Sequence, residues 1–233
     1  GKTWQVSLET SVWRMDADDD GNLYAGNYTQ GDADIATVYK SADDGATWAT
    51  IWTDPHNRHI HTVRWSQADQ RVYIAFGDSA VRGRAYSDDR GATFHDLARW
   101  YRDGPTDAAV TRDYVFWCTD NSSGEVWRVN RATGAQDVLL GHSQLVWFAV
   151  AGGDQIYVGT VTAAKQGGER AALLASRDQG ETWVKLLETD ESTGPFTRGF
   201  ADESRELSAG GWLYCTGGGE GASKPGAHPN QAH

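Results

Sequence analysis

One eight-residue pattern recurs along the chain and limits its fold more than any other feature. The pattern reads Ser-x-Asp-x-Gly-x-Thr followed by Trp or Phe, and it occupies residues 41–48, 87–94 and 176–183. The first four residues, Gly1 to Trp4, match the second half of the same pattern. The chain is therefore expected to begin inside a fourth copy and to be part of a longer protein.

The spacing of the pattern predicts an array of similar structural units. Its glycines stand at positions 1, 45, 91 and 180, so successive copies lie 44, 46 and 89 residues apart, the last step covering two periods. A degenerate copy is expected in that gap, and residues 129–136 keep Gly134 while losing the Ser, Asp and aromatic positions. A period of about 45 residues built from short strands is typical of β-propeller blades. The 233 residues then hold about five blade units in one domain, 1–233, with unit boundaries near 45, 91, 134 and 180.

Short apolar and aromatic runs between Gly, Asp and Asn turns predict the strands of each blade. The second strand of successive units is expected at residues 22–26, 71–77, 114–118, 155–159 and 212–217. First strands are expected at 12–16, 61–65 and 145–150, and fourth strands, which follow the repeated pattern, at 3–8, 47–52 and 182–187. No window has a sustained helical period, so the prediction is an all-β fold of four-stranded antiparallel blades.

Two details of this arrangement stay open. If residues 3–8 complete the final blade, the ring closes with five blades. If they do not, two or three blades are missing and the chain is a fragment of a larger propeller. Residues 217–233, rich in Gly, Pro and Ala, are expected to form a loop or tail.

The residue types of the pattern suit a tight hairpin between the third and fourth strands. The Asp carboxylate can accept hydrogen bonds from the backbone N–H groups that follow it, and the Gly two positions later can adopt a positive φ. The Ser hydroxyl can bond across the turn, and the aromatic ring can pack beneath it against the blade. We therefore expect a stabilising rather than a catalytic role for the pattern residues Ser41, Asp43, Gly45, Trp48, Ser87, Asp89, Gly91, Phe94, Ser176, Asp178, Gly180 and Trp183.

The three copies resemble the Asp-box, or bacterial neuraminidase repeat, of a β-propeller superfamily. That superfamily includes sialidases, xyloglucanase-type glycoside hydrolases, sortilin-like receptors and photosystem assembly factors, so the resemblance implies a fold and leaves the function open. Together with the periodic strands, the resemblance covers nearly the whole chain. Sialidases of this superfamily carry an Arg-Ile-Pro segment that this sequence lacks, and the paired catalytic Asp residues of a xyloglucanase match no position here. The resemblance therefore assigns no catalytic residue.

The charge balance excludes one class of partner. Lys and Arg total 21 against 32 Asp and Glu, a net charge of −11, and so acidic a chain repels phosphate backbones. Nucleic acid is therefore not expected as a partner, and no run of about 20 apolar residues predicts a membrane span. Asp outnumbers Glu, 23 to 9, and Arg outnumbers Lys, 16 to 5, which fits a salt-adapted (halophilic) source and a GC-rich genome equally. Cys118 and Cys215 are too few for a disulfide framework and are expected to be buried, unpaired thiols.

Alignment of the units places candidate ligand-binding residues on the innermost strands. Arg14, Arg64 and Trp147 each stand nine or ten residues before the aromatic residue of the second strand, and Arg198 lies earlier in the fifth unit. Guanidiniums that converge near the axis would suit a carboxylate or sulfate, because each presents a planar fork of donors. The alternative is a structural salt bridge from each Arg to a neighbouring carboxylate such as Asp16.

Two further groups of residues could bind a ligand or an ion. His59 and His61 alternate onto one face of a predicted inner strand, where two imidazoles could hold a metal ion or contact a ligand. No third ligand is evident in the sequence, and hydrogen-bonded structural histidines are the alternative. Asp16, Asp18 and Asp20 match the first positions of a calcium-binding loop. That segment connects two predicted strands, however, so a polar hairpin is the simpler interpretation, and no cofactor is expected to be required.

Three functions remain open. The preferred one is a non-catalytic recognition module, outside the cell or on a cell or virion surface, that binds a glycan or a protein partner at one propeller face. The first alternative is a glycoside hydrolase of sialidase-like or xyloglucanase-like kind, which needs a pair of carboxylates in the axial cleft. The second is a structural subunit of a larger assembly.

Overall fold

The computed structural model describes residues 5–29, 31, 35–78, 82–100, 104–119, 124–141, 145–161, 171–188, 198–202 and 215–219. At residues 98–100, 141, 198–202 and 215–219 it describes the backbone alone. Within these ranges the secondary structure consists of β-strands joined by turns. No helix that is long and apolar enough to cross a lipid bilayer occurs in them.

The strands form four consecutive antiparallel blades, in which neighbours in sequence are hydrogen-bonded neighbours in the sheet. The first blade consists of β1 (Val12–Ala17), β2 (Leu23–Asn27), β3 (Ala36–Ser41) and β4 (Ala49–Asp54). The second consists of β5 (His59–Ser66), β6 (Arg71–Gly77), β7 (Arg82–Ser87) and β8 (His95–Trp100). The third consists of β9 (Pro105–Val110), β10 (Tyr114–Thr119), β11 (Glu125–Asn130) and β12 (Gln136–Gly141). The fourth consists of β13 (Leu145–Gly152), β14 (Gln155–Val161), β15 (Ala172–Ser176) and β16 (Val184–Glu188). A hairpin of β17 (Arg198–Asp202) and β18 (Cys215–Gly219) adjoins β14.

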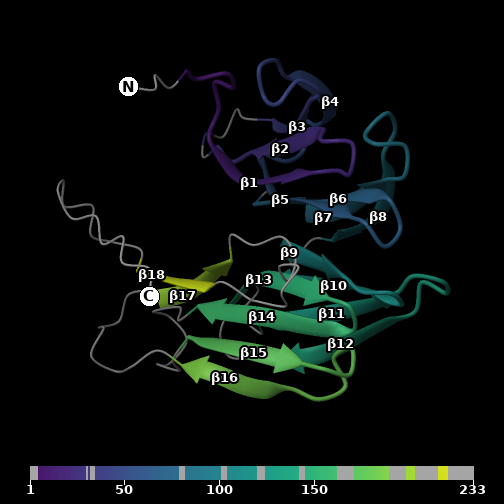
Figure 1. Cartoon of the computed structure of the whole chain (residues 1–233), viewed down its shortest axis with the longest axis vertical. Helices are drawn as coiled ribbons and strands as arrows, with labels where there is room; N and C mark the ends of the chain where they lie inside the picture. The colour runs from purple at the N-terminus through teal and green to yellow at the C-terminus, as the bar shows by residue number, and fades with distance from the viewer. Residues whose placement is uncertain are drawn as a thin grey trace.

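The blades follow one another in chain order around a common centre. Figure 1 shows the first strands β1, β5, β9 and β13 toward the middle of the molecule, with the later strands of each blade farther out. The first strands contact one another, β1 with β5, β5 with β9, and β9 with β13. This is a β-propeller arrangement, and the predicted all-β fold of four-stranded antiparallel blades is confirmed.

Some predicted boundaries differ from the structure. The glycines at 45, 91, 134 and 180 lie in hairpins between third and fourth strands, so the breaks between blades come later, after β4, β8 and β12. Residues 5–8 form no strand, and residues 3 and 4 lie outside the described residues, so the strand prediction for 3–8 is wrong where it can be compared. Residues 217–219 lie in β18 rather than in a tail. These three glycines pair with β17, and strand pairing uses only backbone groups, which glycine has. Residues 212–214 and 220–233 lie outside the described ranges.

The repeated pattern forms the same hairpin three times. In the first copy the Ser41 hydroxyl donates to Asp43 Oδ1 at 2.7 Å, and the Gly45 N–H donates to Ser41 Oγ at 2.9 Å. Thr47 donates its N–H to Asp43 Oδ1 at 2.8 Å and its hydroxyl to Oδ2 at 2.7 Å. The other two copies repeat these four bonds at 2.6–2.9 Å. Gly45 has a φ of +83°, a conformation that glycine adopts without a Cβ clash.

The degenerate copy keeps the hairpin with different chemistry. Asn130 Oδ1 accepts hydrogen bonds from the backbone N–H groups of Ala132 at 3.0 Å and Thr133 at 2.9 Å. Gly134 has a φ of +71° and donates its N–H to the Asn130 carbonyl oxygen at 2.8 Å. An amide side chain therefore replaces the Asp carboxylate as the acceptor within this turn.

The pattern hairpins also join each blade to the blade before it. The carbonyl oxygen of Arg90, in the second blade, accepts hydrogen bonds from the Tyr24 hydroxyl at 3.2 Å and from Lys40 Nζ at 3.0 Å, both in the first blade. In the same way Arg128 of the third blade donates to the Gln179 carbonyl oxygen of the fourth at 2.9 Å. The hairpins therefore stabilise contacts between blades as well as their own turns.

The apolar core lies between neighbouring blades. One cluster joins the first and second blades, and it includes Val38, Ile60 and Ile74, with Phe94 of the repeated pattern half-buried against it. Another joins the third and fourth blades and includes Phe116, Cys118 and Ile156, with Trp183 half-buried against it. Cys118 is a free, buried thiol whose pKa is raised by burial, which makes it unreactive. Cys215 lies in β18, where the structure describes the backbone alone.

The hairpin chemistry predicts a strong difference between two adjacent aspartates. Asp89→Ala removes the acceptor of Ser87 Oγ and of both Thr93 donors, so we expect the thermal unfolding midpoint to fall by several degrees. Asp88→Ala is the matched control, because the first copy has Ala42 at the equivalent position. Differential scanning calorimetry of both variants measures the effect, and equal midpoints would contradict a stabilising role for the pattern carboxylate.

Candidate functional site

The antiparallel order of each blade places its connections on two opposite faces. In the second blade β5 begins at His59, which is paired with Gly77 at the end of β6. The residues just before β5 and just after β6 therefore lie on one face, which we call the entry face and mark by His59 and Asp78. The pattern hairpin joins β7 to β8 and lies on the opposite face. His59 and Asp78 are thus separated from the stabilising hairpin along the length of the strands.

A buried carboxylate on β9 joins the four innermost strands. Asp107 is fully buried, and Arg64 of β5 binds it through two bonds, Nε to Oδ1 at 3.0 Å and Nη2 to Oδ2 at 2.8 Å. The Thr62 hydroxyl donates to Oδ1 at 2.7 Å, and the Ala149 N–H of β13 donates to Oδ2 at 3.1 Å. Arg14 of β1 approaches Oδ2 to 3.7 Å. One side chain therefore connects the first strands of all four blades.

The electrostatic setting keeps Asp107 ionised. Burial alone would raise its pKa, but the guanidiniums of Arg64 and Arg14 outweigh burial and lower the pKa to about 2. A carboxylate with this pKa holds no proton at neutral pH. Asp107 therefore acts as a structural anion at the axis, and it is unsuited to donate a proton to a substrate.

Two of the predicted arginines meet near the axis, where both approach one carboxylate. Arg14 and Arg64 both approach Asp107, whereas the predicted alternative partner Asp16 accepts the Trp65 N–H at 3.0 Å. Arg198 lies in β17, where only the backbone is described. Both described guanidiniums are therefore engaged in holding the propeller together.

Asp107 was not identified from the sequence as a candidate residue, although its spacing from the next strand could have indicated it. It stands nine residues before Phe116 of β10, which is the same offset that separates Arg64 from Tyr73 of β6. Extending that spacing rule to the third blade would have found it.

A second polar cluster lies at the entry face. His59 and His61 are buried, with exposed fractions of 0% and 2%, and their Nε2 atoms lie 3.0 Å apart. Asp78 completes the group, with Oδ2 at 3.2 Å from His59 Nε2 and Oδ1 at 3.4 Å from His61 Nε2. The two histidines lower the pKa of Asp78 well below its usual range. The sequence revealed no third ligand to join His59 and His61. Asp78 takes that place, and it was not evident because it follows the end of the neighbouring strand, β6.

Aromatic side chains surround the two histidines. Tyr28 stacks on His59 with ring centroids 4.3 Å apart, and Trp13 meets His61 edge-on at 6.1 Å. Trp147, a predicted ligand-binding residue, meets Trp13 edge-on at 5.9 Å. Trp13, Tyr28 and Trp147 are all half-buried, so each presents part of its ring to solvent. The entry face therefore combines a polar centre with a partly exposed aromatic border.

The predicted calcium loop is held by other contacts. Asp18 accepts hydrogen bonds from Asn22 and from the Tyr24 hydroxyl, and its Oδ2 lies 2.9 Å from Arg90 Nη1. Asp20 pairs with the same Arg90 nitrogen at 2.7 Å. Within the described residues the three carboxylates Asp16, Asp18 and Asp20 do not converge as a set of ion ligands. This geometry matches a polar hairpin, with an arginine supplying the positive charge.

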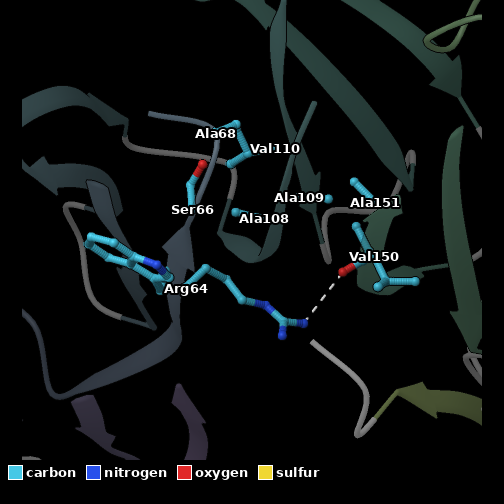
Figure 2. Close-up of a pocket in the computed structure, with 10 residues that line it drawn as sticks. Arg64, Ser66, Ala68, Ala108, Ala109, Val110, Val150 and Ala151 are labelled. Atoms are coloured by element: carbon cyan, nitrogen blue, oxygen red, sulfur yellow. Dashed lines mark hydrogen bonds between the residues drawn. The ribbon is translucent and has the colours of Figure 1, made fainter. Parts of the chain in front are cut away.

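In the described part of the chain, one small hollow lies between the inner strands and another lies between the outer strands of the second and third blades. One of about 40 Å³ lies beside Arg64, Ala108 and Val150, and Figure 2 shows the Arg64 guanidinium reaching across to a backbone carbonyl of β13. Since liquid water takes roughly 30 Å³ per molecule, this hollow suits water rather than a sugar. The other, of about 160 Å³, is lined by Tyr73, Trp117 and several arginines, and it is smaller than the roughly 300 Å³ of a typical ligand pocket.

The setting of Asp107 predicts a specific dependence of stability on pH. Asp107→Asn removes the buried carboxylate that pairs with Arg64, so we expect the free energy of unfolding to fall by roughly 3–5 kcal/mol at pH 7. The Asp107 pKa falls from 3.8 in the unfolded chain to about 2 in the folded protein, so ionisation favours the folded state above the unfolded pKa. This stabilisation is lost as the pH drops toward 2, and the gap between wild type and variant should narrow by roughly 2 kcal/mol.

Urea unfolding between pH 7 and pH 2 measures that gap. Asp44→Asn, an exposed change of the same chemistry, is the control and should track the wild type throughout. A gap of constant size across the pH range would contradict the role assigned to the Asp107 charge.

Comparisons with known proteins establish the fold. No protein-family model matches the sequence, and no curated protein matches it. Among solved structures, the chain is similar to the GH74 enzyme of Niastella koreensis, with a TM-score of 0.56, 20% identity, and coverage of 75% of this chain and 29% of that one. It is also similar to a chain of the nidogen/laminin complex, with a TM-score of 0.56, 12% identity, and coverage of 73% and 63%.

A third similar structure is the extracellular domain of a putative one-component system from B. thetaiotaomicron, with a TM-score of 0.57, 12% identity, and coverage of 82% and 24%. The chain thus spans between about a quarter and two thirds of the length of these proteins. At such identities the likeness speaks to architecture alone. The chain is a β-propeller.

Proposed function

We propose that this protein is a non-catalytic recognition module that binds a glycan at its entry face. The observation that carries the proposal is the group of half-buried rings Trp13, Tyr28 and Trp147 around the polar centre of His59 and His61. Aromatic rings that keep one surface exposed pack against the C–H faces of sugars, while nearby polar groups bind the hydroxyls. The entry face offers both kinds of contact within one small area.

The state of the described carboxylates favours binding over hydrolysis. A glycoside hydrolase needs one carboxyl group with a raised pKa to protonate the leaving oxygen, and a second carboxylate on the other side of the bond. Asp107 and Asp78 both have lowered pKa values, and Asp107 uses its oxygens in bonds that hold the strands. Neither is suited to the acid role.

Two further parts of the proposal concern family and location. The hairpins at 41–48, 87–94 and 176–183 support membership of the Asp-box propellers, since each repeats the same Ser–Asp–Gly–Thr hydrogen bonds. An extracellular or surface location is proposed because one similar structure is described as an extracellular domain. The low share of lysine and the excess of aspartate fit a surface that must stay hydrated in salt.

Glycan-array screening followed by titration calorimetry tests the function. We expect binding without turnover, and Trp147→Ala should weaken the affinity by roughly tenfold or more because it removes a stacking surface. Trp65→Ala is the matched control. Trp65 is also a half-buried tryptophan of an inner strand, β5, but its Nε1–H donates to Asp19 in the turn between β1 and β2, away from the entry face.

The other outcomes would each overturn the proposal. Hydrolysis of sialyl or xyloglucan substrates would make the protein a glycoside hydrolase. Capture of a defined protein by the entry face, sensitive to Trp147→Ala and without glycan binding, would make it a protein-recognition module. Loss of affinity with Trp65→Ala alone would move the binding surface to the opposite face.

A further inference from the structure

The cluster of His59, His61 and Asp78 brings three potential metal ligands together. His59 Nδ1 lies 2.7 Å from the Thr29 carbonyl oxygen, and His61 Nδ1 lies 2.8 Å from the Pro105 carbonyl oxygen. A carbonyl oxygen only accepts hydrogen bonds, so each Nδ1 must carry the ring proton. In the neutral rings both Nε2 atoms then present lone pairs, and these point at each other and at the Asp78 carboxylate.

Such lone pairs repel one another unless a proton or a metal ion lies between them. The three ligand atoms lie within 4.8 Å of one another. Among the described residues, this is the cluster of three side chains that could hold a metal ion. The measured edges are 3.0 Å between the two Nε2 atoms, 3.2 Å from His59 Nε2 to Asp78 Oδ2, and 3.4 Å from His61 Nε2 to Asp78 Oδ1. For zinc bonds of about 2.0–2.1 Å, the edges of a tetrahedron are about 3.3–3.4 Å. The three separations are therefore close to the edge length of a zinc tetrahedron, with Asp78 reaching the two Nε2 atoms through different oxygens.

Surrounding groups hold the three side chains in place. Carbonyl oxygens at both Nδ1 atoms set the ring tautomers and orientations, as they do for metal-bound histidines. Arg58 Nη2 donates to Asp78 Oδ2 at 3.1 Å and orients the carboxylate. Asp78 itself has a φ of +65°, a left-handed conformation that Asp adopts more readily than most residues with a side chain.

The preceding residue makes room for the cluster. A Cβ atom on Gly77 would lie 2.8 Å from Cε1 of the His61 ring, closer than such atoms pack. Glycine at this position therefore lets the imidazole lie directly against β6. The sequence Gly77-Asp78 supplies both the space for one ligand and the carboxylate of another.

We propose that His59, His61 and Asp78 bind a divalent transition metal ion, with zinc as the best fit and a fourth position open to an external oxygen ligand. Two imidazoles and one carboxylate suit zinc and its first-row neighbours, whereas calcium takes oxygen ligands throughout. Three protein ligands leave one tetrahedral position free. Asp78 is the exposed member of the group, with 25% of its side chain accessible, so the free position faces solvent at the entry face.

This inference stands independently of the proposed glycan binding. The ion would join β5 to the end of β6, and its free position would lie beside the half-buried rings of Trp13 and Tyr28. A hydroxyl or carboxylate of a ligand at that face could complete the coordination. Failure to bind glycans would leave the metal site untouched, and failure to bind metal would leave the aromatic border intact.

Titration calorimetry of the chelator-treated full chain with ZnCl₂ tests the site. We expect one zinc ion per chain and no heat from CaCl₂ at the same concentrations. His59→Gln and Asp78→Asn each remove a ligand while keeping a similar shape, so each should weaken zinc binding by more than the roughly 10- to 100-fold typical of a lost supporting group. Arg58→Gln, which removes such a supporting group, should cost roughly tenfold.

Matched controls separate this site from other histidines and carboxylates. His56→Gln changes an exposed histidine near the cluster, and Asp88→Asn changes an exposed carboxylate on the opposite face; both should bind zinc as the wild type does. Circular dichroism and thermal melting establish that the ligand variants are folded. A zinc-dependent rise in melting temperature in the wild type and controls, absent from folded ligand variants, would support the site.

Cobalt substitution tests the open position. Co²⁺ in a four-coordinate site absorbs strongly in the visible region, and addition of azide should shift that spectrum by replacing a bound water. An unchanged spectrum would contradict the open fourth position. Absence of stoichiometric zinc binding, or equal affinity in His59→Gln, Asp78→Asn and both controls, would overturn the metal site and leave a shared proton as the occupant of the cluster.

Discussion

The structure depends most on the buried ion pair between Asp107 and Arg64 at the propeller axis. Successive blades are joined covalently only by the chain segment that connects them. Noncovalent contacts between their first strands must therefore hold them side by side. Asp107 does this with one carboxylate that meets donors from β5 and β13 and lies near Arg14 of β1. A buried charge costs much free energy unless it is fully paired, and here the partners come from the three other blades. The pairing therefore favours this arrangement of blades over others that would leave the carboxylate unpaired.

The two faces of the propeller carry different chemistry because the blade topology keeps them apart. The pattern hairpins lie on one face, and their Ser, Asp and Thr side chains satisfy the turns while backbone carbonyls such as that of Arg90 bind the previous blade. The entry face has no such repeated element in the described part of the chain. It instead carries residues that differ between blades, including the pair His59 and His61 and the rings of Trp13 and Trp147. A stable hairpin face thus allows the opposite face to vary with function.

Much of the fold could be predicted because the decisive interactions are local. The Ser41–Asp43–Gly45–Thr47 bonds close within seven consecutive residues, so the pattern, its hairpin and its period could all be read along the chain. The third blade was harder, because Ala132 stands at the Asp position, Asn130 supplies the acceptor from the Ser position, and only Gly134 marked the turn. The strand expected at residues 3–8 is not formed at residues 5–8, the part of that range that the structure describes.

The sequence by itself determined the all-β class, the blade period and the turn chemistry, since all three follow from residue types at fixed short spacings. Only the tertiary structure decided which charges and rings meet. Asp107 lies 43 residues from Arg64, and their contact exists because β5 and β9 lie side by side at the axis. Asp78 joins His59 and His61 because β6 runs back along β5 and ends at the entry face. A spacing rule can place a side chain on an inner strand, but which side chains then meet depends on how the strands are brought together in space.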